Sequence, residues 1–266
     1  MLNLFSAQGI SAIRRLAEVP SLLAFDLDGT LSPIVVRPAD AEVPFTTAVR
    51  LRALASVWPI AVITGRSVAD AQKRLNFTPR YLFGNHGAEG SNRQLSAHLH
   101  RLLDPCREHL QRCSLAIKSR KIDVEDKGLS FALHYRDIES GPETRAWLNE
   151  LITPLHSYIS TSHGHQVMNI MPLHAPDKGD ALRETMHHCG ALNALVIGDD
   201  VNDEPAFAKA PADSVTVRIG SVSTVTQARF RLSTQTQVDR LLSILFSIKR
   251  HGRKAAGLSE TFALRN

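Results

Sequence analysis

A short run near the start of the chain most constrains its fold. Four apolar residues, Leu22-Leu23-Ala24-Phe25, run directly into two carboxylates, Asp26 and Asp28, which a single leucine separates. An apolar run of this length that ends at Gly29-Thr30 is typical of a buried strand, and the carboxyl end of such a strand is where open α/β sheets place ligands. Because unpaired buried carboxylates are costly, the two acids need a metal, a cation or a substrate. The run therefore predicts metal-assisted chemistry.

The same arrangement of apolar run and polar turn recurs along the chain. The further runs with their turns are Ile60 to Ile63 before Thr64-Gly65-Arg66, Tyr81 to Phe83 before Gly84-Asn85-His86-Gly87, and Ala194 to Ile197 before Gly198-Asp199-Asp200. Residues with helical spacing lie between or beside them, at 46–57, 67–75, 178–189 and 238–248, and a further strand is expected at 215–219. This alternation predicts a doubly wound, Rossmann-like α/β fold with a parallel sheet.

The pattern changes in the middle of the chain. The expected elements there are a helix at 99–115, two alternating strands at 121–124 and 129–135, a helix at 144–155 and a strand at 166–171. Strands paired as a hairpin, with helices on one face, are typical of an α+β unit. We therefore expect a smaller α+β cap domain at 104–173, inserted into a core domain formed by 1–103 and 174–266.

Composition limits the partners and the compartment. The 266 residues carry a formal charge of +5, but the basic residues are scattered and show no nucleic-acid-binding pattern. No apolar stretch approaches the length of a membrane span or of a secretory signal. The three cysteines form no CxxC pair, which is typical of reduced thiols in the cytoplasm. We expect a cytoplasmic protein that is a monomer or a weak homo-oligomer and binds neither nucleic acid nor membrane.

Polar groups at four of the predicted strand ends and helix starts suit one chemistry. They are Asp26 with Asp28, then Thr64, then Lys178, and last Asp199 with Asp200 and Asp203. Each group alone is ordinary, since a threonine can cap a helix and Gly-Asp-Asp can be a plain turn. Phosphoryl transfer needs all of them together: an oxygen nucleophile, a proton donor and positive charge around the phosphoryl oxygens. A hard divalent ion, Mg²⁺, would neutralise the clustered acids and polarise the phosphate.

These residues resemble the four motifs of the haloacid dehalogenase-like phosphatases. In order, they are Asp26 to Leu31, Thr64-Gly65-Arg66, Lys178-Gly179 and Gly198 to Glu204, and the inserted unit resembles the α+β cap of one subgroup. Two further segments, Gly84 to Glu89 and Lys127 to Arg136, are similar to those of trehalose-6-phosphate phosphatases. The likeness spans most of residues 20–245.

The resemblance implies a role for each residue. Asp26 would be the nucleophile and Asp28 the general acid and base. The metal ligands would be Asp26, the backbone carbonyl of Asp28, and Asp199. The groups that bind phosphate would be Thr64, Gly65 and Lys178, and the residues that support metal and phosphate from behind would be Asp200, Asn202 and Asp203. The residues that face the sugar would be Arg66, His86, Glu125, Lys127, Arg136 and Asn169.

The chain departs from the trehalose group at the predicted last strand of the cap. It has Asn169-Ile170-Met171-Pro172 where that group usually has Glu-x-Arg/Lys-Pro, so a cation is lost at Met171. Asn202 also replaces the usual threonine. His163, His165 and His174 lie nearby, but their irregular spacing favours a loop over a metal site.

The expected function is hydrolysis of trehalose 6-phosphate to trehalose and phosphate, through an aspartyl-phosphate. One alternative is the same chemistry on another sugar phosphate, such as a mannosyl, glucosyl or sucrose phosphate. A second is a non-catalytic sugar-phosphate sensor on the same fold. The intact set of Asp26, Asp28, Lys178 and Asp199 argues against a sensor, because a pure binder has no use for a nucleophile and an acid.

Overall fold

The larger of two sheets carries the ends of the predicted apolar strands. A computed structural model describes residues 1–90, 93–135, 138, 141–164, 166–221 and 225–263. Its parallel sheet has seven strands in the order β1-β11-β10-β9-β2-β3-β4. They are β1 Leu2–Asn3, β2 Ser21–Phe25, β3 Ile60–Ile63, β4 Tyr81–Phe83, β9 Asn193–Gly198, β10 Val215–Ile219 and β11 Phe230–Leu232. The chain leaves β2 toward β3 and later returns on its other side at β9, so the strand order reverses at β2 and opens a crevice there.

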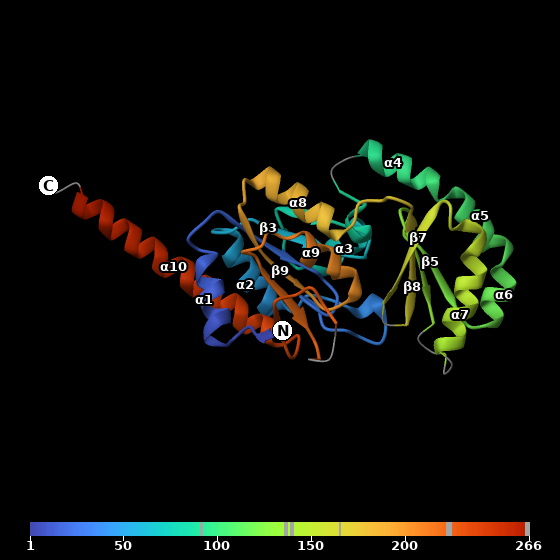
Figure 1. The fold of residues 1–266 in the computed structure, drawn as a ribbon, viewed down its shortest axis with the longest axis horizontal. Coiled ribbons are helices and arrows are strands. Elements are labelled where there is room, and N and C mark those ends of the chain that lie inside the picture. Colours follow the sequence, from blue (N-terminus) through green and yellow to red (C-terminus); the bar gives the residue numbers. More distant parts are fainter. Residues whose placement is uncertain (91–92, 136–137, 139–140, 165, 222–224, 264–266) are drawn as a thin grey trace.

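Helices cover both faces of this sheet (Figure 1). On β2, Leu23 and Phe25 belong to one buried cluster and Leu22 and Ala24 to another, as the alternation of side chains along a strand requires. The helices on the first face are α1 Ala7–Arg15, α2 Phe45–Ala55, α3 Val68–Arg74 and α10 Gln237–Ala263. Those on the second face are α8 Lys178–Cys189 and α9 Glu204–Lys209. Short 3-10 turns lie at η1 Pro38–Asp40, η2 Asn85–Gly87 and η4 Val201–Asp203.

The second sheet is antiparallel and has four strands in the order β5-β6-β8-β7. Its strands are β5 Asp123–Asp126, β6 Phe131–His134, β7 Ile159–Gly164 and β8 Val167–Pro172. The segments beside it are α4 Arg93–Leu102, α5 Asp104–Arg112, α6 Ser114–Ser119, α7 Gly141–Ile152 and η3 Thr153–Leu155. The helices α5 to α7 pack on one face over a separate hydrophobic core, and the other face of the sheet turns toward the parallel sheet (Figure 1).

The structure confirms the predicted fold class, a parallel α/β core with a separate α+β unit. All four strands of the antiparallel sheet fall within the predicted cap, 104–173, while the boundaries of that domain stay a prediction. No helix among the described residues is long and apolar enough to cross a membrane.

Three local predictions were wrong. The helix expected at 99–115 is divided among three short helices, α4 to α6, and Pro105 in the first turn of α5 explains the break between α4 and α5. The strand β7 was missed, and His163 lies in it rather than in a loop. The last helix does not end at residue 248 but continues to Ala263 and carries the C-terminal end away from the sheet (Figure 1).

Candidate active site

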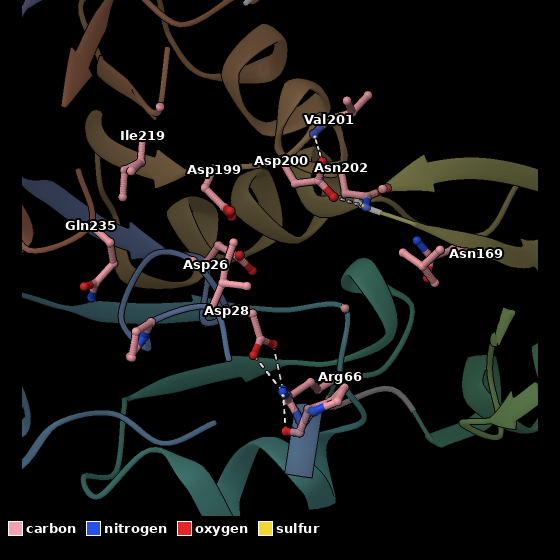
Figure 2. Close-up of a pocket in the computed structure, with 18 of the residues that line it drawn as sticks. Asp26, Asp28, Arg66, Asn169, Asp199, Asp200, Val201, Asn202, Ile219 and Gln235 are labelled. Carbon is pink, nitrogen blue, oxygen red and sulfur yellow. Dashed lines mark hydrogen bonds and ion pairs between the residues drawn. The ribbon is translucent and has the colours of Figure 1, made fainter. Parts of the chain in front are cut away.

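A cavity of about 930 Å³ lies between the two sheets. Its core side includes Asp26, Asp28 and Asp199, and its cap side includes Asn169 (Figure 2). Glu125 also lines the cap side. The core residues follow β2 and β9, which are neighbours in the sheet, so their side chains meet at the same edge. The cavity thus occupies the crevice that the reversal of strand order creates.

Lys178 joins two of the acids at the bottom of this cavity. Its Nζ lies 2.7 Å from Asp26 Oδ1 and 2.7 Å from Asp203 Oδ1, and all three side chains are buried. Burial opposes the charge on Lys178, but Asp203 and Asp26 outweigh it and hold its pKa above the ordinary value. A lysine in the first turn of α8 opposes the helix dipole, and these two carboxylates offset that cost.

The acids outnumber this one cation. Carboxylate oxygens of Asp26, Asp199 and Asp203 all lie within 4.8 Å of one another. Burial raises the pKa of Asp26, and burial together with the charge of Asp26 raises the pKa of Asp199. When ionised, these three carboxylates carry more negative charge than Lys178 neutralises. A hard divalent cation with carboxylate ligands fits this donor set.

Gly29 permits the close approach of Asp199 to the loop after β2. Its φ is +76°, and a Cβ at this position would lie 2.0 Å from Asp199 Oδ2. Any side chain here would push the carboxylate of Asp199 out of the acidic cluster. The glycine next to Asp28 is therefore required by the geometry of the site.

Asp28 makes a bidentate ion pair with Arg66. Arg66 Nε lies 2.6 Å from Asp28 Oδ2, and Arg66 Nη2 lies 2.7 Å from Asp28 Oδ1 (Figure 2). Arg66 also donates to Asp70 Oδ2 at 2.7 Å. Planar guanidinium and carboxylate groups paired in this way orient each other strongly. The structure places Arg66 against Asp28 at the cavity wall, and its contact with a sugar stays a prediction.

Thr64 and Gly65 lie between β3 and α3, and of the two only Gly65 is among the described residues that line the cavity, so their contact with phosphate stays a prediction. Thr64 is fully buried, and its hydroxyl accepts from the backbone N–H of Arg66 at 3.2 Å. Gly65 lies against the ring of His86, since a Cβ on Gly65 would lie 2.4 Å from His86 Cε1. Burial, and then the charges of Lys178 and Lys127, lower the pKa of His86 well below its usual value. The environment of His86, which lies beside Gly65, thus favours the uncharged imidazole.

The cap side of the cavity is polar. In the antiparallel sheet, Glu125 pairs with Ala132, which also pairs with Asn169, so these residues share the face that lines the cavity. Glu125 Oε2 accepts from His134 Nε2 at 3.0 Å, and this hydrogen bond is the main reason that the pKa of Glu125 is lowered.

Lys127 extends from the β5–β6 loop to the core, where its Nζ donates to the carbonyl oxygen of Gly65 at 3.0 Å. Arg136 lies outside the described residues. Met171 is not among the described residues that line the cavity, whereas Asn169 is.

The loop after β9 holds the supporting residues. Asp200 Oδ1 accepts from Val201 N at 2.7 Å, and its Oδ2 accepts from Asn202 Nδ2 at 3.2 Å (Figure 2). Asp203 Oδ2 accepts from the backbone N–H of Asp200 at 2.9 Å, and its Oδ1 accepts from Lys178 Nζ, so this carboxylate holds both the lysine and the loop after β9.

Sequence reasoning missed several residues that line this cavity, among them three with polar side chains. They are His134 beside Glu125, Arg218, which donates to the carbonyl oxygen of Asp200 at 2.6 Å, and Gln235, which donates to the carbonyl oxygen of Thr30 at 3.0 Å. Strand periodicity could have indicated His134, because its register partner Val167 lies on the same face as Asn169. Nothing local marks Arg218 or Gln235, whose partners lie far away in the chain.

Known proteins resemble this chain over most of its length. The family model for trehalose-phosphatase matches residues 24–236. The trehalose-6-phosphate phosphatase of Escherichia coli (strain K12) is 30% identical over 82% of this chain and 85% of its own length.

An uncharacterized glycosyl hydrolase of Mycobacterium tuberculosis (strain H37Rv) is 34% identical over 68% of this chain, which spans 15% of that protein. Among solved structures, the C-terminal domain of a trehalose-6-phosphate phosphatase from C. albicans superposes with a TM-score of 0.75 at 22% identity, covering 90% of this chain and 96% of that one. This last likeness shows the fold.

Proposed function

The chain belongs to the trehalose-phosphatase family and is a phosphatase, and from this premise we propose that it hydrolyses trehalose 6-phosphate to trehalose and inorganic phosphate. One observation carries the proposal. The cluster of Asp26, Lys178 and Asp199 lies at the bottom of a cavity whose opposite wall is a polar face of the cap sheet. The cluster suits a phosphoryl group, and the polar wall suits the hydroxyls of a sugar.

The phosphoryl group would lie between the cluster and the phosphate-binding loop. Lys178 would contribute positive charge, and Thr64 and the backbone of Gly65 would donate hydrogen bonds to phosphoryl oxygens. The carboxylates of Asp26 and Asp199, with the backbone carbonyl of Asp28, would hold Mg²⁺. Bound there, Mg²⁺ would neutralise the clustered acids and polarise the phosphate.

The reaction would take two steps at Asp26. In the first, a carboxylate oxygen of Asp26 would form a bond to phosphorus and the bond from phosphorus to the sugar oxygen would break. Asp28, released from its ion pair with Arg66 and protonated, would give its proton to the departing oxygen. In the second, Asp28 takes a proton from a water whose oxygen attacks phosphorus. The bond between phosphorus and Asp26 then breaks, which restores the carboxylate and releases phosphate.

The cap would select the sugar. Glu125, held by His134, and Asn169 face the cavity, so both can bind sugar hydroxyls. Lys127 lies between this face and Gly65, at the junction of the sugar and phosphate parts of the cavity. The boundary of the cap at 104–173 and a cytoplasmic location are part of the same proposal.

A panel of phosphate esters tests the proposal. Phosphate release would be measured with trehalose 6-phosphate, sucrose, glucosyl and mannosyl phosphates and p-nitrophenyl phosphate, with Mg²⁺ and after chelation. We expect the highest kcat/KM for trehalose 6-phosphate and loss of activity with chelator, restored by Mg²⁺.

Asp26→Asn is the matched control, because it keeps the size of the side chain and removes the nucleophile. We expect turnover to fall by a factor of about 10³ or more with an unchanged fold. A different best substrate would refute the trehalose assignment alone, while substantial residual turnover in the variant would refute the nucleophile.

A further inference from the structure

A chain of buried hydrogen bonds joins the cap to the phosphate-binding loop. It begins at Ser130, in the loop between β5 and β6, whose hydroxyl donates to Asn85 Oδ1 at 2.5 Å. Ser130 is 1% exposed and Asn85 is fully buried. Asn85 belongs to η2, after strand β4 of the core, so this hydrogen bond crosses from one sheet to the other.

Through Glu89, the side-chain amide of Asn85 is linked by hydrogen bonds to the start of helix α3. Asn85 Nδ2 donates to Glu89 Oε2 at 2.7 Å, and the same oxygen accepts from the backbone N–H of Val68 at 2.8 Å. Since an ionised carboxylate can only accept, the NH₂ group must face Glu89, which leaves the amide oxygen toward Ser130. We call Ser130, Asn85, Glu89 and Val68 the relay.

The backbone around Asn85 is also bonded to the phosphate-binding loop. Asn85 N donates to the carbonyl oxygen of Arg66 at 2.7 Å, and His86 N donates to that of Thr64 at 2.9 Å. Both residues adopt left-handed conformations, with φ of +48° and +59°, which non-glycine residues rarely adopt. A strained turn that survives in a buried place needs its surroundings to hold it, and the relay is part of those surroundings.

Lys127 makes a second connection between the same two parts. Its Nζ donates to the carbonyl oxygen of Gly65, and its backbone N–H donates to that of Ser130 at 2.9 Å. The β5–β6 loop of the cap therefore contacts the loop of residues 64–68 both directly and through Asn85.

We propose that Asn85 is a positioning residue that couples the seating of the cap to the order of residues 64–68. Asn85 is not among the described residues that line the cavity, so it acts through the loop rather than on a substrate. With the cap in place, Ser130 satisfies the amide oxygen and the relay holds the start of α3. Without Ser130, a buried acceptor loses its partner and the loop that carries Thr64, Gly65 and Arg66 loosens.

Hydrogen–deuterium exchange on the free protein tests the relay without any substrate. Ser130→Ala should raise exchange in the peptide that spans 64–70 by about fivefold, the effect of losing one hydrogen bond, although Ser130 lies in the cap. Ser119→Ala is the matched control, since Ser119 is an exposed cap serine whose hydroxyl donates only to Ala116 O. An unchanged 64–70 peptide, or an equal rise throughout the protein, would overturn the proposal.

Kinetics give the second readout and rest on the proposed function. Ser130→Ala should lower kcat about fivefold for the best sugar phosphate and for p-nitrophenyl phosphate alike, because both esters place their phosphoryl group against the loop that carries Thr64 and Gly65. Asn85→Gly, which suits the left-handed φ, should lower kcat to a similar degree, and the double variant should be no worse than the poorer single one.

Multiplied losses in the double variant, or a loss confined to the sugar phosphate, would contradict the coupling. The two proposals fail separately. Absence of sugar-phosphate turnover refutes the proposed function and leaves the exchange result standing. Unchanged exchange in an enzyme that does hydrolyse sugar phosphates refutes the relay alone.

Discussion

Asp70 holds two arginines beside the loop that follows β3. Arg66 and Arg74 each donate to its carboxylate at 2.7 Å, and Arg66 at the same time pairs with Asp28. Burial alone would raise the pKa of Asp70, but the hydrogen bonds from Arg74 and Arg66 lower it from 3.8 to about 2. This residue therefore stabilises the native state only while it is ionised.

The change Asp70→Asn should destabilise the protein in a pH-dependent way. At neutral pH we expect the free energy of unfolding to fall by about 1 kcal/mol, as for partly exposed ion pairs. Because the pKa is lowered on folding, the contribution is complete above the unfolded pKa of 3.8 and is lost as pH falls toward about 2. In denaturant titrations, the free energies of unfolding of the two proteins should thus approach each other as the pH falls from about 4 to about 2.

Asp40→Asn is the control for this comparison. Asp40 pairs with Arg37 at 2.7 Å, but its side chain is 49% exposed, so its removal should change stability little. A difference between wild type and Asp70→Asn that stays constant into strong acid would contradict the assigned ion pairs.

At the scale of elements, helix α8 carries Lys178 in its first turn, the end of a helix where the dipole is least favourable to a positive charge. Asp177 caps the helix by accepting from the backbone N–H groups of Gly179 and Asp180 at 2.8 and 3.0 Å. Lys209, at the end of α9, donates to the carboxylate of Asp177 and to that of Asp180. The N-cap Asp177 thus fixes the first turn of α8, from which the side chain of Lys178 reaches Asp26.

The change Asp177→Ala should lower both stability and activity. Loss of the N-cap should cost about 1 kcal/mol in the free energy of unfolding. We also expect kcat to fall about tenfold, because the neighbouring Lys178 loses its fixed position. Thermal unfolding and steady-state kinetics measure the two effects.

Ser6→Ala is the matched control, since Ser6 caps α1, a helix that lines no part of the cavity. It should lose stability alone. If Asp177→Ala likewise lost stability alone and kept its kcat, the N-cap residue Asp177 would not position Lys178.

At the scale of the whole molecule, the cap also meets the core beside the acidic cluster. Gly164, at the end of β7, approaches Asp200 so closely that a Cβ there would lie 2.7 Å from Asp200 Oδ2. That carboxylate already accepts from Val201 and Asn202, so it has little freedom to move. The absence of a side chain at Gly164 lets the two sheets close over the cavity.

The change Gly164→Ala should hold the cap slightly open. We expect kcat/KM for the best sugar phosphate to fall about tenfold, with little change for p-nitrophenyl phosphate, since only the sugar needs the closed cap. Gly141→Ala is the matched control, because a Cβ at Gly141 meets nothing within 4 Å. Equal losses on both esters would show that Gly164 acts on the chemistry and not on closure.

Much of the core was predictable because its signals are local. The strands β2, β3 and β10 and the helix α8 follow from apolar runs and caps that lie within a few residues of one another. The cap was less predictable. Strand β7 carries His163, Gly164 and two serines in place of an apolar alternation, and it is a strand because β8 pairs with it across the hairpin.

The sequence by itself determined the chemistry that can occur, because carboxylates placed directly after buried strands must meet at one sheet edge. The positions of Asp26, Asp28 and Asp199 after strands made them candidates, and the resemblance to a phosphatase family supplied their expected roles. The tertiary structure decided which partner each charge takes. Lys178 lies 152 residues from Asp26, and Ser130 lies 45 residues from Asn85. Such pairs depend on how distant segments pack, which no local periodicity encodes, and so the hydrogen bonds between the β5–β6 loop and the loops after β3 and β4 became visible only in the fold.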